Sequence, residues 1–204
     1  MNIAIIDYGM GNLHSVYKSV QAAADAAQSS AKITLTSTPE NVLAADKVIF
    51  PGQGAMPDCM NALNQSGLRE AVQESLKNKP LFEHSEEGDT AGLGWFKGGV
   101  KRFAANQTDT QGNRLKVPHM GWNTVCQTQA HPLFTGVSNP AHFYFVHSYY
   151  FAPQDSDIVL GTSEYPHDFA CIVGKDNVFA TQFHTEKSHE AGLRLLQNFL
   201  QWQG

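Results

Sequence analysis

The first half of the chain alternates short apolar runs with longer segments whose apolar residues recur every three or four positions. A short apolar run that stops at a turn is typical of a buried strand, and the longer spacing is typical of a helix with one buried face. The strand-like runs are 2–7, 33–36 and 46–50, and another begins at Lys79. The helix-like segments are 13–24, preceded by the candidate N-cap Asn12, and 68–76. This alternation predicts a parallel sheet covered by helices on both faces.

The second half of the chain has a different pattern. From 92 to 165 its apolar runs are short and separated by Gly, Pro and Asn, which is typical of antiparallel strands and loops. The runs 169–173 and 178–183 flank a hairpin signal, and Ser188 is a candidate N-cap for a last helix. We therefore predict a single domain over residues 1–204. Its class is α/β, an open, mostly parallel sheet flanked by helices with an antiparallel second-half extension.

Charge, hydropathy and cysteine usage exclude several classes of partner. A net charge of −5 argues against nucleic acid, because phosphate binding requires a basic surface. No apolar run approaches the roughly 20 residues that cross a bilayer, and the N-terminus lacks the basic start of a signal peptide. The three cysteines show no disulfide pattern, which suits a reducing compartment. We expect a cytoplasmic protein with no nucleic-acid or membrane contacts.

Three polar or glycine-rich segments fall at the predicted carboxyl ends of strands, where ligands bind in open parallel sheets. They are 7–11, 51–54 and 183–186. Taken singly, each glycine-rich turn is more simply a tight connection, and a His-x-Glu pair is more simply surface polar sequence. Their coincidence at strand ends indicates a functional site without naming its reaction.

The residues of these segments resemble those of a known family. The segment 182–188, Q-F-H-T-E-K-S, is similar to the Q-F-H-P-E-K-S segment of class I, triad-type glutamine amidotransferases, with Thr185 in place of the usual proline. The loop 51–56 resembles the oxyanion-hole loop of the same family. More narrowly, three long motifs resemble the glutaminase subunits of imidazole glycerol phosphate synthase. These motifs are 5–13, 117–123 and 143–149.

The resemblance implies that the chain hydrolyses L-glutamine to glutamate and ammonia through a Cys-His-Glu triad. A cysteine thiolate would attack the side-chain amide, His184 would carry the thiol proton to the leaving ammonia, and Glu186 would orient the imidazole. Backbone N–H groups around Gly52 and Gln53 would stabilise the oxyanion. The reaction needs no cofactor. The nine histidines show no metal-ligand spacing, so no metal site is expected.

The same resemblance implies contacts to the substrate. Glu87 and His147-Ser148-Tyr149 would hold the amino-acid head group of glutamine. Two plainer interpretations stand beside this one. Glu87 lies in an acidic stretch that is equally typical of a solvated helix end, and the aromatic residues of 143–149 are equally typical of a core strand.

A protein partner is also implied by the resemblance. The ammonia would pass to a (β/α)8-barrel cyclase subunit, which makes imidazole glycerol phosphate and AICAR in histidine biosynthesis, and the two chains would form a heterodimer. The residues expected at this interface are Asn12, Met120, Trp122 and Lys187. An exposed Met–Trp pair suits an interface, and such a pair suits a core strand nearly as well.

The nucleophile of the family is missing from this sequence. After a Lys-Pro, relatives continue through an elbow of the form G-x-C-x-G-x-Q, whereas here Pro80 leads directly into 81–88, and roughly ten residues are absent. Cys59 follows the oxyanion loop in a helix-like stretch, and Cys126 and Cys171 lie in strand-like segments. None of the three lies on a strand-to-helix turn between glycines, so none replaces the nucleophile.

Two interpretations of this gap are open. Either the polypeptide lacks the elbow and is catalytically dead, or the elbow exists in the molecule and is absent only from the sequence. A true deletion would unpair backbone groups in a central strand and leave a void, and a dead relative has no chemical reason to keep His184 beside Glu186. We favour the second interpretation. It predicts a chain break between Pro80 and Glu83, because bonded neighbours have Cα atoms about 3.8 Å apart.

Three further functions stay open. The chain could be a dead scaffold or regulatory subunit of the same fold, which a full-length chain without glutaminase activity would favour. It could be the glutaminase subunit of another synthase, against which the motifs 117–123 and 143–149 argue. A cysteine peptidase or chaperone of the same broad fold would explain His184 and would leave those two motifs without a role.

Overall fold

The computed structural model describes residues 1–52, 54, 56–78, 81–84, 93–108 and 111–204. Its strands are β1 (Asn2–Ile6), β2 (Lys32–Thr36), β3 (Lys47–Phe50), β4 (Leu81–His84), β5 (Gly98–Arg102), β6 (His119–Gln127), β7 (Ala141–His147), β8 (Tyr149–Pro153), β9 (Val159–Glu164), β10 (Asp168–Lys175) and β11 (Val178–Thr181). Its helices are α1 (Leu13–Ala26), α2 (Pro39–Ala44), α3 (Met56–Ser66), α4 (Arg69–Asn78) and α5 (His189–Gln201). Three 3-10 turns complete the described elements, namely η1 (Pro132–Phe134), η2 (Ser156–Ile158) and η3 (Thr185–Lys187).

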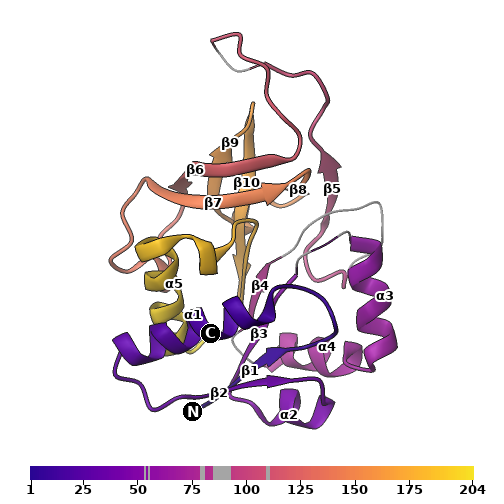
Figure 1. Ribbon diagram of the computed structural model, residues 1–204, viewed down its shortest axis with the longest axis vertical. Coiled ribbons are helices and arrows are strands. Elements are labelled where there is room, and N and C mark those ends of the chain that lie inside the picture. The colour runs from indigo at the N-terminus through magenta and orange to yellow at the C-terminus, as the bar shows by residue number, and fades with distance from the viewer. Residues whose placement is uncertain (53, 55, 79–80, 85–92, 109–110) are drawn as a thin grey trace.

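One large sheet organises the molecule (Figure 1). Over the described residues it has nine strands, in the order β2-β1-β3-β4-β11-β10-β9-β6-β7, and β5 pairs with β8 in a separate ribbon. The pairs from β2 to β11 are parallel, and those from β11 to β7 are antiparallel. The predicted fold class, a mostly parallel α/β sheet with an antiparallel second-half extension, is confirmed.

Strand β1 shows how the two faces of the parallel half are covered. Successive side chains of a strand point to opposite faces. Ile3 and Ile5 therefore pack in one core with α1 and α5, whereas Ala4 and Ile6 pack in a second core with α2, α3 and α4. Because parallel strands end at one edge, the segments that follow β1, β3, β4 and β11 all emerge there. This edge is where the sequence predicts the functional site.

Local signals predicted several of these elements well. Asn12 is the N-cap of α1, and its side chain accepts a hydrogen bond from the backbone N–H of Ser15. The hairpin of β10 and β11 turns at 176–177, with Asp176 at a φ of +52°. The short helix α2, which begins at Pro39, was not predicted. In the parts of the chain that the structure describes, no helix combines the length and apolarity needed to cross a membrane.

Strand β4 occupies the centre of the sheet, next to the sequence gap. Its residues 81–83 pair with 48–50 of β3, and 81–84 pair with 178–181 of β11, without a register shift. The residues after the gap therefore build the central strand themselves, and over Leu81–His84 the unpaired backbone expected of a true deletion is not observed. The predicted chain break does not fall within Leu81–His84, while Lys79 and Pro80 lie outside the described residues.

Candidate active site

His184 and Glu186 form a buried pair immediately after β11. Nδ1 of His184 lies 2.9 Å from Oε1 of Glu186, and the two side chains are 3% and 5% exposed. The backbone N–H of His184 donates to the carbonyl oxygen of Tyr144 at 2.9 Å, which ties the pair to β7. Because a carboxylate only accepts, Nδ1 carries the proton that Glu186 binds. In the neutral imidazole, Nε2 is then the basic nitrogen.

Ser188 supports this pair in a way that the sequence did not predict. It occupies the N-cap position of α5, but its side chain makes no capping hydrogen bond, so the predicted capping role is wrong. Its Oγ instead donates to the carbonyl oxygen of His184 and accepts from the backbone N–H of Tyr144 at 3.0 Å. A hydroxyl can donate and accept at once, and here both bonds join β7 to the turn 184–188.

A close backbone approach between α5 and η3 also shapes the turn that carries the pair. A Cβ atom on Gly192 would lie 2.0 Å from the carbonyl oxygen of Thr185 and 2.9 Å from its carbonyl carbon. Thr185 separates His184 from Glu186 in the sequence. Only glycine at position 192 therefore allows the helix to pack against the turn in this position.

The predicted oxyanion loop follows β3 at the same edge of the sheet. Gly52 is buried at its start, and Gln53 lies outside the described residues. Gly54 has a φ of +139°, and a Cβ atom there would lie 2.9 Å from Cε of Met10 in the turn after β1. The structure thus brings together the segments 7–11 and 51–54, as the sequence predicted for two strand ends.

The order of the strands places the end of β4 between these groups. Gly52 follows β3 and His184 follows β11, and β4 lies between the two strands. With neighbouring strands roughly 4.8 Å apart, β3 and β11 are separated by about 10 Å. A nucleophile at the carboxyl end of a strand in this central position would therefore have an oxyanion loop on one side and the basic nitrogen of His184 on the other.

The predicted substrate segment 147–149 joins β7 to β8. The imidazole of His147 is 1% exposed, so it does not face a ligand from the surface. Its Nδ1 lies 2.8 Å from the carbonyl oxygen of Tyr149, and the carbonyl oxygen of Ser148 accepts from the backbone N–H of Phe103 at 2.9 Å. Glu87, the other predicted substrate residue, lies outside the described residues.

The residues predicted at the partner interface include a large exposed apolar pair. Met120 and Trp122 lie on one side of β6 and are 62% and 47% exposed. The ring of Trp122 packs edge-on against Tyr144 at 5.9 Å, and Nζ of Lys187 lies 5.8 Å from the same Tyr144 ring. These residues of β6, β7 and η3 form one surface beside the His184–Glu186 pair. Asn12 lies at the start of α1, a helix that also contacts η3.

The three cysteines lie where the sequence predicted, away from any strand-to-helix turn. Cys59 is in α3, Cys126 is exposed on β6, and Cys171 is buried on β10. Burial raises the pKa of the Cys171 thiol well above its usual value, which disfavours the thiolate that attacks a substrate.

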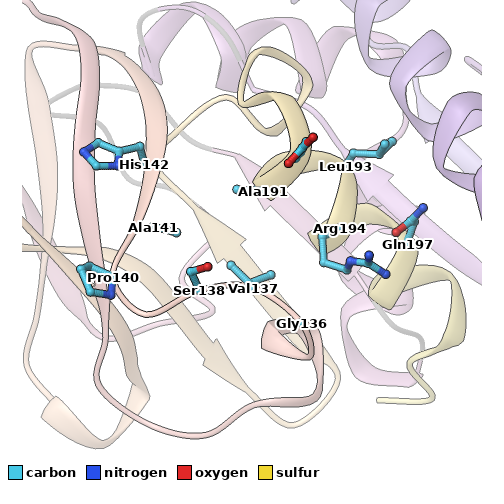
Figure 2. Close-up of a pocket in the computed structure, with 11 residues that line it drawn as sticks. Gly136, Val137, Ser138, Pro140, Ala141, His142, Ala191, Leu193, Arg194 and Gln197 are labelled. Atoms are coloured by element: carbon cyan, nitrogen blue, oxygen red, sulfur yellow. The ribbon is translucent and has the colours of Figure 1, made fainter.

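A hollow of about 620 Å³ lies elsewhere, between the segment 136–142 and α5 (Figure 2). Arg194 and Gln197 line it from the helix, and Pro140 and His142 line it from the opposite segment. It contains none of the predicted site residues.

Comparisons with known proteins show the family to which the chain belongs. The family model for glutamine amidotransferase class-I matches residues 95–202. The imidazole glycerol phosphate synthase subunit HisH of Neisseria gonorrhoeae is 65% identical over 212 positions, covering 99% of this chain and 100% of that protein. The HisH subunit of Chromobacterium violaceum is 61% identical over 214 positions, covering 100% of this chain and 99% of that protein. The chain belongs to the HisH family.

Solved structures share the fold at low sequence identity. A GMP synthase protein from Thermoplasma acidophilum superposes with a TM-score of 0.70 at 17% identity, over 98% of this chain and 92% of that one. A glutamine amidotransferase from Thermotoga maritima superposes with a TM-score of 0.60 at 14% identity, over 98% and 83% of the two chains. These matches support the amidotransferase-like architecture of this HisH family member.

The HisH alignments also measure the gap. The alignment to the Chromobacterium protein spans 214 positions, whereas this chain has 204 residues, so that relative has at least ten positions without a counterpart here. This length agrees with the roughly ten residues that the family motif places after Pro80.

Sequence reasoning overlooked one buried residue of the HisH motif 117–123. His119 is 4% exposed and contacts His147 directly, whereas only Met120 and Trp122 were predicted to be functional in this motif. The alternation of the strand could have found it, since positions 119, 121 and 123 share the face opposite to that of Met120 and Trp122.

Proposed function

We propose that this chain is the glutaminase subunit of an imidazole glycerol phosphate synthase and supplies ammonia to a (β/α)8-barrel cyclase subunit. The observation that carries the proposal is the buried His184–Glu186 pair, with 2.9 Å between Nδ1 and Oε1, at the carboxyl edge of the sheet. Sequence identity of 65% to a HisH subunit over the whole chain supports the same pathway and partner.

The residues present would serve each step of an acyl transfer. His184 takes the thiol proton on Nε2, the thiolate forms a C–S bond to the side-chain carbonyl carbon of glutamine, and backbone N–H groups near Gly52 stabilise the oxyanion. When the C–N bond breaks, the imidazolium returns the proton and ammonia leaves. Water then attacks the thioester with His184 as base, releasing glutamate and restoring the thiol. Glu186 holds the imidazole in the required tautomer throughout.

The missing nucleophile is part of the proposal. We assign it to an elbow of at least ten residues that joins the chain between Pro80 and Glu83 in the catalytic protein, in keeping with the longer HisH relatives. The test combines two measurements on the protein purified from its natural source with its cyclase. The intact mass should exceed 22.4 kDa, and the complex should release glutamate from glutamine. A mass of 22.4 kDa with no glutamate release would overturn it.

A second candidate function is a docking subunit without glutaminase activity. The unbroken, fully paired β4 favours it, because this central strand forms without an elbow. The candidate predicts a mass of 22.4 kDa, no glutamate release and co-elution with the cyclase. The same two measurements, with gel filtration of the mixed subunits, therefore separate the candidates.

The proposed partner surface comprises Met120, Trp122, Lys187 and Asn12 beside the catalytic pair. An exposed aromatic residue next to a cation is typical of the centre of a protein interface. Docking there would place the barrel over the site, so that ammonia passes between the subunits and is not released to water. The proposed compartment is the cytoplasm, which suits three cysteines that form no disulfide with one another.

A further inference from the structure

A hydrogen-bonded chain of buried side chains lies beneath the segment 147–149. Nδ1 of His119 lies 2.8 Å from Nε2 of His147, and Nδ1 of His147 lies 2.8 Å from the carbonyl oxygen of Tyr149. At the other end, Nδ2 of Asn123 lies 3.3 Å from Nε2 of His119. The two imidazoles are 4% and 1% exposed, so the hydrogen bonds between them are shielded from water. We call this chain of side chains the histidine relay.

The Tyr149 end of the relay determines the direction of its hydrogen bonds. The carbonyl oxygen of Tyr149 can only accept, so His147 carries a proton on Nδ1. A neutral His147 then accepts at Nε2, and His119 must donate to it from Nδ1. The remaining nitrogen of His119, Nε2, is left as an acceptor.

The Asn123 end requires the same direction. The Oδ1 atom of Asn123 accepts from the backbone N–H of Thr124 at 2.7 Å, which identifies the opposite atom as the amide nitrogen. That nitrogen has two hydrogens. One is donated to the carbonyl oxygen of Glu164 at 2.9 Å, and the other points to Nε2 of His119. Every member of the relay is therefore satisfied in a single pattern, with both histidines neutral.

The surroundings of the relay keep it neutral. His119 stacks between the rings of Tyr165 and Phe145, with centroid distances of 3.9 and 5.0 Å. Burial, with a smaller contribution from His147, lowers the pKa of His119 to about 3. Burial also lowers the pKa of His147 to about 4; the hydrogen bond to the carbonyl oxygen of Tyr149 opposes this shift, and His184 adds slightly to it. Among the described residues, titratable side chains close to the relay or to the rings packed on it include Tyr150, Tyr165, His167 and His184. The neighbouring strands β5, β9 and β10 also carry Lys101, Arg102, Glu164 and Asp168.

The relay holds the 147–149 turn, to which the family resemblance assigns the head group of glutamine. His147 closes this turn, because its imidazole donates to a carbonyl two residues further along the chain. The carbonyl oxygen of Ser148 is bound from the other side by the backbone N–H of Phe103. Both carbonyls of the turn are thus bound by the protein, and its orientation depends on the relay. The face of β6 opposite His119 carries Met120 and Trp122, so the relay and the proposed docking surface lie on opposite faces of this strand.

We propose that His119 and His147 are positioning residues whose neutral, one-way relay holds the 147–149 turn in the shape that receives the head group of glutamine. The role of the turn rests on the proposed function. His147 acts through its buried imidazole and not by contact with substrate. The sequence motif 117–123 gave no role to His119. In this proposal His119 acts through its hydrogen bond to His147.

The first experiment tests the relay without any assay of activity. In the full-length chain labelled with 15N-histidine, NMR should show His119 and His147 as neutral imidazoles protonated on Nδ1, the less common tautomer in free histidine. Their resonances should not titrate between pH 5 and pH 8. Detection of an Nε2-protonated tautomer, or titration near pH 6.5, at either residue would overturn the proposal.

The second experiment tests positioning with a matched pair of variants. His119→Leu removes the N–H that donates to His147. His119→Asn keeps an N–H donor close to the position of Nδ1 of His119. In complex with the cyclase, His119→Leu should raise the KM for glutamine about tenfold with a smaller change in kcat, and His119→Asn should recover most of that loss. The control is His142→Leu, which removes an exposed histidine from the neighbouring strand and should leave both constants unchanged.

The same variants separate this proposal from the proposed function. If the wild-type complex releases no glutamate, the proposed function fails. The relay is then tested by the NMR signals of the 147–149 turn, which require no activity. His119→Leu should then shift the backbone amide resonances of Ser148 and Tyr149, whereas His119→Asn should leave them near their wild-type positions. Unchanged resonances in the leucine variant, or equal shifts in the two variants, would contradict the positioning role.

Discussion

At the scale of single residues, Glu186 determines what His184 can do. A histidine that is buried after a strand has two nitrogens of similar basicity, and only a fixed partner decides which of them carries the proton. Here the partner is a carboxylate 2.9 Å from Nδ1, itself 5% exposed. Low exposure strengthens this contact, because little water competes for either group.

Replacing Glu186 by Gln should therefore reduce catalysis without unfolding the protein. The amide keeps the size of the side chain but loses its charge and can present an N–H to Nδ1, so we expect kcat for glutaminase activity to fall about a thousandfold with little change in KM. The measurement is glutamate release by the complex with its cyclase, using protein whose mass confirms the elbow. Glu190→Gln, an exposed change on α5, is the control. A kcat within tenfold of wild type would contradict this role for Glu186.

Gly192 is a second case in which one residue decides the local structure, because the lack of a side chain allows α5 to pack against the backbone of Thr185. In Gly192→Ala, the new methyl group would meet the backbone of Thr185, which cannot move aside as a side-chain tip can. We expect a loss of about 1–3 kcal/mol in the free energy of unfolding and a displaced His184–Glu186 pair. Urea unfolding measures the first effect. Gly99→Ala on β5 is the matched control, since nothing lies within 4 Å of its added Cβ.

At the scale of elements, local patterns predicted what depends on neighbours in the sequence. Helix α1 with its cap and the β10–β11 hairpin follow from spacing and turn residues within a few positions. The order β9-β6-β7, by contrast, depends on contacts between distant segments, which no local pattern encodes. The Ser188 side chain was mispredicted for the same reason. A cap is a local preference, and the distant backbone of Tyr144 competes for the hydroxyl.

The candidate site shows the same difference between residues predicted from local motifs and residues brought together by long-range contacts. The pair His184 and Glu186 and the loop at Gly52 were predicted because each lies in a short motif at a strand end. The histidine relay was not, because His119 and His147 are 28 residues apart in sequence and become neighbours only through the pairing of β6 with β7.

Helix α5 is held at its C-terminal end by a lysine from the sheet. Lys47 of β3 is 2% exposed, and its Nζ donates to the carbonyl oxygens of Phe199, Leu200 and Trp202. Burial lowers the pKa of Lys47 to about 8, while the charge of Asp46 opposes this shift. At pH 7 the side chain is still mainly an ammonium, whose charge also suits the negative end of the helix dipole.

Lys47→Met should therefore destabilise the protein by about 2–4 kcal/mol, because the last carbonyl groups of α5 lose their donor in a buried place. The urea midpoint at pH 7 measures this loss, and hydrogen exchange should show faster exchange in the last turn of α5. Lys32→Met, an exposed lysine on β2, serves as the control. Equal stability of the two variants would show that the buried ammonium contributes nothing net.

At the scale of the whole molecule, the buried histidines set the response to acid. The folded-state pKa values of His119 and His147 are lowered to about 3 and about 4, against an ordinary value of 6.5. Below pH 6.5 the unfolded chain therefore binds more protons than the folded one, so stability rises with pH in this range. Above pH 6.5 both histidines are neutral in the folded and the unfolded chain, and they cost no stability. As the pH falls towards 4 and then 3, the unfolded chain is stabilised by protonation and the free energy of unfolding decreases.

We accordingly expect the free energy of unfolding to fall by roughly 1.4 kcal/mol per pH unit for each of these histidines below pH 6. Urea unfolding at intervals between pH 4 and pH 7 measures the slope. His119→Asn, which cannot titrate, should reduce the slope by about 1.4 kcal/mol per pH unit, whereas His147 and His131, whose pKa is also lowered by burial, keep their contributions. A slope that is the same in wild type and variant would mean that other groups dominate acid unfolding.

The pairing of β4 on both sides has a consequence for assembly with the cyclase. Because 81–84 are paired on both sides, the scaffold that displays Met120 and Trp122 persists in a chain without an elbow. Under the proposed docking at Met120 and Trp122, such a chain would compete with an elbow-bearing chain for the same cyclase, and its abundance would limit how many synthase molecules can use glutamine. A short internal deletion in a gene of this family would thus produce a protein that inhibits assembly of the full-length subunit with the cyclase.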